Sequence, residues 1–135
     1  MSVTNSDTQS GTLASSYTYT SAAVLQWQTG AASPNPPNPD NYGSTTVNVS
    51  HTYTLINNGD ITSASLTLSK TGAQSGAWYF GTDNCTGSTL AASATCTVQV
   101  IFLAGVPLPS GSYSAILSAT DGSSTTTNNM TGTVP

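Results

Sequence analysis

Apolar and polar residues alternate with a period of two along most of this chain, and no stripe with the 3.6-residue period of a helix reaches helical length. The clearest alternation lies in TVNVSHTYTL, residues 46–55, where one face carries only Asn, Ser and Thr. The opposite face is formed by Val47, Val49, His51, Tyr53 and Leu55. This pattern predicts a strand with one buried face.

Five later segments show the same alternation or a short aromatic run bounded by glycines. They are SASLTLS (63–69), GAWYFG (76–81), ATCTVQVIF (94–102), SYSAILSAT (112–120) and NNMTGTV (128–134). The residues that we predict to face inward are Ala64, Leu66, Leu68, Cys96, Val98, Val100, Phe102, Tyr113, Ala115, Leu117, Ala119, Met130 and Val134. We expect ATCTVQVIF to be a central strand, because both of its faces carry apolar residues near its end. NNGD (57–60) and DG (121–122) are typical turn sequences, and the second predicts a hairpin.

An N-terminal strand within residues 12–28 is indicated by the alternation of Ala23, Leu25 and Trp27. It is followed by SPNPPNPDN, residues 33–41, which holds four of the seven prolines. Proline cannot donate a hydrogen bond to a strand ladder and its φ is fixed, so we predict a stiff connector or crossover here. A crossover would make the N-terminal strand part of this domain, whereas a rigid arm would present it to a neighbouring molecule.

About seven short strands, separated by turn residues and without helices, predict an all-β fold built as a two-sheet antiparallel β-sandwich. Residues 1–135 are long enough for one ordinary hydrophobic core and too short for two domains of usual size. We therefore expect a single domain, with 1–42 as its N-terminal strand and Pro-rich connector.

Charged residues are almost absent, and this limits the partners that the chain can bind. Lys70 is the only basic residue, Asp accounts for all five acids, and Ser and Thr make up 45 of the 135 residues. Nucleic-acid binding requires several Lys or Arg to neutralise phosphates, so a single lysine excludes that class of partner. No apolar run approaches the roughly 20 residues of a membrane-spanning helix, and we expect no membrane insertion.

Four segments, taken in order, resemble a known family of bacterial modules. They are GSTTVNVSHTYTLINNGD, DNCTGSTLAASATCTVQVIF, GSYSAILSAT and the terminal TGTV. Together, over residues 43–134, they resemble the immunoglobulin-like modules of the choice-of-anchor D type, which are related to the ASPM, SPD-2 and Hydin domains. The resemblance implies an immunoglobulin-like sandwich that serves as a repeated spacer or adhesive module outside the cell. It implies no catalytic residues and no cofactor.

The two cysteines, Cys85 and Cys96, are eleven residues apart. The spacing is neither CxxC nor that of a complete zinc site, since His51 is the only histidine that could add a ligand. The family pattern implies that they form a disulfide, which would pin a loop to the strand that follows it. Free buried thiols are the alternative.

Two other residues invite chemical roles that we weigh against structural ones. His51 could act as a base beside a serine, but its inward position next to Tyr53 predicts a hydrogen-bonded structural residue, and no GxSxG motif supports catalysis. Lys70 could form an amide crosslink, but it falls at a strand end and no Glu is present to assist. We expect Lys70 to be exposed to solvent.

Aromatic side chains could form a platform for sugars, with Trp78, Tyr79 and Trp27 as the possible surface binders. Adjacent residues of a strand face opposite ways, so either Trp78 or Tyr79 must point outward. The simpler interpretation is that one is buried in the core and the other covers a sheet face.

The sequence therefore predicts a non-enzymatic structural or adhesive module of an extracellular or cell-surface bacterial protein. Its expected partners are neighbouring protein modules or copies of itself. Two alternatives stay open: a self-assembling filament or coat subunit that donates its N-terminal strand, and a carbohydrate-binding module that uses the exposed aromatics.

Overall fold

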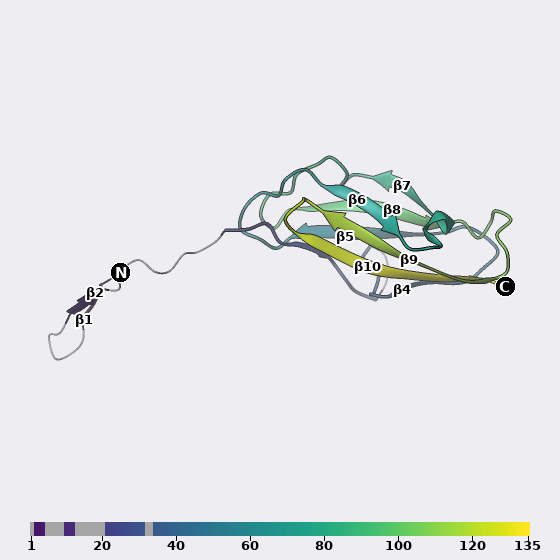
Figure 1. The fold of residues 1–135 in the computed structure, drawn as a ribbon, viewed down its shortest axis with the longest axis horizontal. Helices are drawn as coiled ribbons and strands as arrows, with labels where there is room; N and C mark the ends of the chain where they lie inside the picture. Colours follow the sequence, from purple (N-terminus) through teal and green to yellow (C-terminus); the bar gives the residue numbers. More distant parts are fainter. Residues whose placement is uncertain (1, 5–9, 13–20, 32–33) are drawn as a thin grey trace.

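The computed structural model describes residues 2–4, 10–12, 21–31 and 34–135, and strands dominate it (Figure 1). One four-stranded sheet has the order β3 (Leu25–Trp27), β5 (Val49–Asn57), β8 (Thr95–Phe102) and β7 (Trp78–Asp83). The other has the order β4 (Asp40–Ser44), β10 (Thr125–Val134), β9 (Gly111–Thr120) and β6 (Thr67–Thr71). A short 3-10 turn, η1 (Ser75–Ala77), precedes β7. The two sheets pack face to face, which confirms the predicted all-β immunoglobulin-like sandwich.

The Pro-rich connector moves the chain from one sheet to the other. β3 pairs antiparallel with β5, and after residues 34–39 the chain continues as β4, which pairs parallel with β10. The Asn38–Pro39 peptide bond within the connector is cis. If β3 and β4 are counted as one strand split between the sheets, the described sandwich has the seven strands expected, with one parallel pair that the pattern did not predict. The connector is therefore a crossover, as one of our two interpretations proposed.

β1 (Ser2–Thr4) and β2 (Ser10–Thr12) form a separate antiparallel pair. Residues 13–20, which include part of the predicted N-terminal strand, lie outside the described residues. In the described part of the chain, no helix is long and apolar enough to cross a membrane.

The core lies between the sheets and is built by the alternation seen in the sequence. Its fully buried side chains include Tyr53, Leu55, Trp78, Val98, Val100, Phe102, Leu117 and Met130. β8 lies between β5 and β7 and is central, as predicted. Gly132 on β10 faces the ring of Phe102, and a Cβ at this position would come within 2.7 Å of that ring. The absence of a side chain at Gly132 therefore makes room for the largest residue of β8.

Two residues predicted to face inward are exposed, because the strands that hold them begin later than expected. Val47 is 64% exposed, since β5 starts at Val49 and residues 45–48 form a turn. Ala64 is exposed because β6 starts at Thr67. Ser63 is buried in its place, and its hydroxyl accepts a hydrogen bond from the Leu90 amide at 2.9 Å.

The predicted DG turn is confirmed. β9 and β10 form a hairpin of ten residue pairs, from Thr120 opposite Thr125 to Gly111 opposite Val134. The Asp121 carboxylate accepts hydrogen bonds from the Ser123 and Ser124 amides and closes the turn.

Candidate functional site

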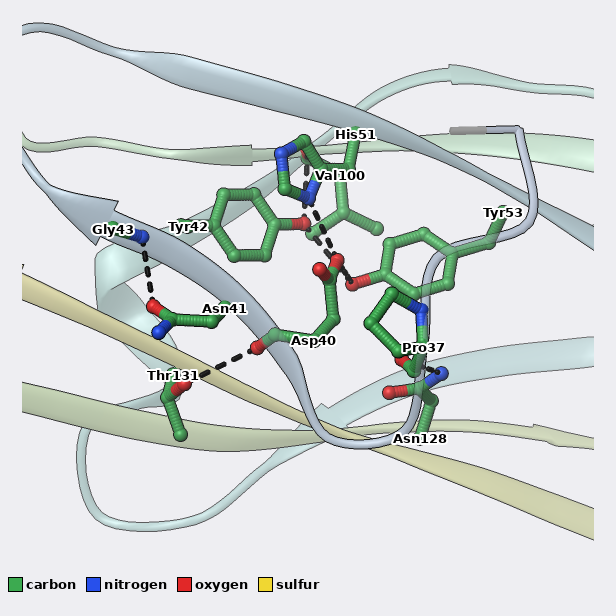
Figure 2. Close-up of polar contacts among 10 residues, drawn as sticks. All are labelled: Pro37, Asp40, Asn41, Tyr42, Gly43, His51, Tyr53, Val100, Asn128 and Thr131. Carbon is green, nitrogen blue, oxygen red and sulfur yellow. Dashed lines mark hydrogen bonds and ion pairs between the residues drawn. The ribbon is translucent and has the colours of Figure 1, made fainter. Parts of the chain in front are cut away.

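A buried carboxylate joins the two sheets at the start of β4 (Figure 2). Asp40 is 2% exposed and points across the sandwich toward β5. Its Oδ2 atom accepts a hydrogen bond from the Tyr53 hydroxyl at 2.6 Å and lies 2.7 Å from Nδ1 of His51. A buried carboxyl group is tolerated only when hydrogen bonds satisfy it, and both partners of this oxygen come from the opposite sheet.

Tyr42, two residues after Asp40, extends this cluster. Its ring stacks on His51 with ring centroids 4.2 Å apart, and its hydroxyl lies 3.2 Å from that of Tyr53. The same hydroxyl donates to the Val100 carbonyl at 3.3 Å. Burial raises the pKa of both tyrosines far above the usual range, and the charge of Asp40 adds to the shift. Both phenols therefore stay protonated and keep their role as hydrogen-bond donors.

The connector fixes the position of Asp40 through bonds to β10. The Asn38 side chain accepts a hydrogen bond from the Asn129 amide at 3.0 Å, and the Asn128 side chain donates to the Pro37 carbonyl at 3.1 Å. The Thr131 hydroxyl donates to the backbone carbonyl of Asp40 at 3.2 Å. These bonds to β10 fix the backbone from Pro37 to Asp40, and the fixed backbone holds the Asp40 side chain against β5.

The Asp40–His51 pair has the geometry by which a carboxylate orients a histidine, but its partners tie it to the fold. Tyr53 shares the same carboxylate oxygen, and Tyr42 covers the ring of His51. Among the residues that the structure describes, no group of three or more His, Cys, Asp or Glu is arranged to hold a metal ion. The cluster therefore links the two sheets through hydrogen bonds.

Cys85 and Cys96 are joined by a disulfide, with a sulfur–sulfur distance of 2.01 Å. The bond fastens the loop that follows β7 to β8, as the family pattern implied. Asp83 organises the same loop, since its carboxylate accepts hydrogen bonds from the amides of Cys85 and Thr86 and from the Thr86 hydroxyl. Burial alone would raise the pKa of Asp83, but these hydrogen bonds hold it below its ordinary value.

A second buried polar residue, Asn57, anchors the N-terminal segment, and sequence reasoning missed it. Its side-chain amide donates to the carbonyls of Ile61 and Leu90, and its side-chain oxygen accepts from the amides of Val24 and Gly59. The sequence showed NNGD only as a turn. A local turn pattern does not reveal that this Asn side chain binds backbone groups from three separate segments.

The turn around Asn57 holds the segment that leads into β3. The Asp60 amide donates to the Ala22 carbonyl, the Ala22 amide donates to the Asp60 carboxylate, and Gly59 passes so close that a Cβ would lie 2.0 Å from the Ala22 oxygen. On the outer edge of β3, the amides of Leu25 and Trp27 donate to hydroxyls of the β9–β10 hairpin, at Ser124 in its turn and Thr126 on β10. Both edges of this short strand are therefore occupied by the chain's own groups.

The three aromatic residues considered as possible surface binders are not brought together on one surface, and of Trp78 and Tyr79 one is buried and the other points outward, as the simpler interpretation expected. Tyr79 is 59% exposed, whereas Trp27 and Trp78 are buried in the core. Trp27 packs edge to face on Tyr53, with ring centroids 5.9 Å apart, and Trp78 packs on Phe102 at 5.0 Å. The expectation that Trp27 and Trp78 could offer sugar-binding surface is wrong, because the core needs their apolar area.

Lys70 is half-buried, which corrects the expectation that it is exposed. Its ammonium group donates to the Trp78 carbonyl and lies 4.9 Å from the centre of the Phe80 ring. Burial lowers its pKa. Lys70 therefore connects β6 with β7, the edge strands of the two sheets on this side of the sandwich.

Comparison with known proteins supports the fold. No protein-family model matches the sequence, and no curated protein matches it. Among solved structures, a family 123 glycoside hydrolase from Clostridium perfringens is similar at 10% identity with a TM-score of 0.64, over 82% of this chain and 27% of that one. The secreted serine protease VesC from Vibrio cholerae is similar at 16% identity with a TM-score of 0.55, over 82% and 23%.

A PapD-like domain of human CEP192 is similar along nearly its whole length. It is 13% identical with a TM-score of 0.54, over 93% of this chain and 94% of that domain. The present chain spans only about a quarter of the two enzymes named above. At these identities the likeness concerns the fold alone, and it places the chain among immunoglobulin-like sandwiches.

Proposed function

We propose that this chain is a non-enzymatic structural module that works as a spacer or adhesive unit in an extracellular or cell-surface bacterial protein. The resemblance to modules of the choice-of-anchor D type supports this proposal. So does the immunoglobulin-like fold, which is shared with the PapD-like domain. The observation that carries the proposal is the path of the chain through the sandwich.

The chain enters the sandwich at one end and leaves it at the other (Figure 1). Residues 21–23 lie beside the turn between β9 and β10, where they line one hollow together with Asp121 and Ser123. Val134 pairs with Gly111 at the far end of the ten-pair hairpin, about 30 Å away at the usual rise of a strand. A domain of this kind, placed in series with others, adds its full length to the protein.

The polar chemistry of the domain also favours a structural role. Asp40 and His51 link the sheets, and both cysteines are bonded to each other. Disulfides persist in oxidising compartments, which favours an exported protein. Ser and Thr supply a neutral polar surface where charged residues are nearly absent.

Neither alternative function gains an observation of its own. The pairing of β3 with β5 of the same chain favours a self-contained module over a subunit that donates this strand. A sugar-binding platform would depend on Tyr79 without the two tryptophans.

Small-angle X-ray scattering from two copies of the 135-residue chain joined in series tests the proposal. A spacer predicts a maximum dimension at least about twice that of the single chain, because each copy adds its length along its strands. A compact pair with the two sandwiches folded side by side, little longer than one copy, would rule out the spacer role.

A further inference from the structure

We propose that copies of this chain bind head to tail, with one end of a sandwich seated on the opposite end of the next copy. The inference rests on the proposed function, since modules in series bring these two ends together. We define the open end as residues 45–48 and 103–110, and the turn end as residues 21–24, 57–64 and 121–124. Of the six large apolar residues that are most exposed in the described part of the chain, four lie at these ends: Val47, Val106, Val24 and Ile61.

The open end presents two exposed valines on loops that are fixed to each other. Val47 is 64% exposed and Val106 is 42% exposed. The Asn48 side chain accepts a hydrogen bond from the Gly105 amide at 2.8 Å, and a Cβ at Gly105 would come within 2.9 Å of that same oxygen. Neither loop contains a charged residue. The open end is thus an uncharged surface with two exposed valines on loops that are fixed to each other.

The turn end presents a hollow of about 350 Å³. Its lining includes Ala22, Ala23, Ile61 and Ala64, with Asp121 among the polar residues around them. Ile61 is 44% exposed, and Val24 belongs to the same end. The hydrogen bonds between Ala22 and Asp60 hold the wall of the hollow in place, so little conformational freedom would be lost on binding.

Charge and shape favour a head-to-tail contact over two symmetric ones. Two turn ends in contact would bring together four carboxylates, from Asp60 and Asp121 of each copy, and like charges at an interface are costly. Two open ends in contact would leave the hollows of both copies empty. An open end on a turn end places uncharged aliphatic groups over an alanine-lined hollow.

The contact is expected to be weak between separate copies. A few aliphatic side chains bury much less than the roughly 1,200 Å² of a stable interface. Copies joined in series meet at a high effective concentration, so a weak contact suffices to align them. Because it is heterologous and does not close on itself, the contact can be repeated along a row of modules.

Sedimentation velocity of the intact chain, from micromolar to about millimolar concentration, tests this inference. We expect the sedimentation coefficient of the wild-type chain to rise with concentration. The variants Val106→Asp, at the open end, and Ile61→Asp, at the turn end, should each remain monomeric. Ile116→Asp is the matched control, because Ile116 is similarly exposed but lies on the face of β9, and it should behave as wild type.

Mixing the two end variants separates a head-to-tail contact from a symmetric one. Val106→Asp keeps an intact turn end and Ile61→Asp keeps an intact open end, so the mixture should form dimers that do not grow further. Val47→Asp and Val24→Asp give a second pair of variants if circular dichroism shows that either of the first pair is unfolded.

Three results would overturn the inference: no association of the wild-type chain, association that survives either end substitution, or a mixture that stays monomeric. The spacer role would stand in each case if two linked copies still scatter as an extended particle. A compact linked pair would instead rule out the spacer role itself.

Discussion

The surroundings of Asp40 are sensitive to change, because two side chains of the opposite sheet converge on one of its oxygens. The Tyr53 hydroxyl and the His51 ring both lie within 2.7 Å of Oδ2. Removing the carboxylate would leave a buried phenol without its acceptor, and such unsatisfied groups cost more than the original bond contributed. The cluster therefore fixes how β4 docks on β5.

We predict that Asp40→Ala lowers the free energy of unfolding by about 3 kcal/mol, the upper end of the cost of leaving buried hydrogen-bonding groups without their partner. Urea denaturation monitored by tryptophan fluorescence measures this change. Asn41→Ala, the exposed neighbour, is the control and should cost about 1 kcal/mol or less. Equal effects of the two substitutions would show that the cluster does not stabilise the contact between the sheets.

Asp83 makes the stability of the domain depend on pH in the acid range. Although burial opposes the shift, hydrogen bonds from Thr86 and Cys85 lower its pKa in the folded state below the value in the unfolded chain. Its contribution to stability is therefore complete above its ordinary pKa of about 4 and is lost as the pH falls through the lower, folded-state pKa. Denaturation midpoints measured from pH 6 to pH 2 should fall less steeply for Asp83→Asn than for wild type. Parallel curves would contradict this.

At the scale of single elements, the turn after β5 decides whether β3 can dock. A Cβ at Gly59 would overlap the Ala22 carbonyl oxygen, so Gly59→Ala must displace the segment leading into β3. We expect a loss of about 2 kcal/mol or more, as for other overpacked sites, together with faster amide exchange at Leu25 and Trp27. Gly76→Ala is the control, since no atom lies near its added methyl group. If both substitutions are equally mild, the turn does not hold β3.

The disulfide acts on the loop between β7 and β8. Cross-linking residues 85 and 96 closes a loop of about a dozen residues, which stabilises a fold by about 3 kcal/mol in the chain-entropy model. The double variant Cys85→Ser/Cys96→Ser should lose about that amount in urea denaturation. Wild type under reducing conditions should match it, and a wild-type stability that does not change on reduction would show that the bond contributes little.

The sequence predicted those elements whose own alternation determines them, and it missed contacts between distant segments. The predictions of β8 and of the hairpin of β9 and β10 were correct, because the apolar period and the turn residues are local properties of the sequence. The predictions that Val47 and Ala64 face inward were wrong, because alternation does not mark where a strand begins or ends. The contact of Asp40 with Tyr53 depends on a connector that crosses between the sheets, and no local sequence pattern predicts that contact.

At the scale of the whole molecule, β3 and β4, which together form the first strand of the sandwich, complete its two sheets. β3 covers the edge of one sheet, where Trp27 packs on Tyr53, and β4 extends the other sheet beside β10. The Pro-rich connector joins them within one chain. A self-contained sandwich that the chain enters and leaves at opposite ends is the central claim of the proposed spacer role.

The molar mass in solution tests that claim most directly, by static light scattering over a series of micromolar concentrations. A chain that uses its own first strand predicts a constant mass of 13.6 kDa. Deletion of residues 1–30 should then lower stability, since Leu25 and Trp27 leave the core, without changing the monomeric state. Large ordered particles of the intact chain that disappear on this deletion would show that the strand is donated to a neighbour, and would contradict the account.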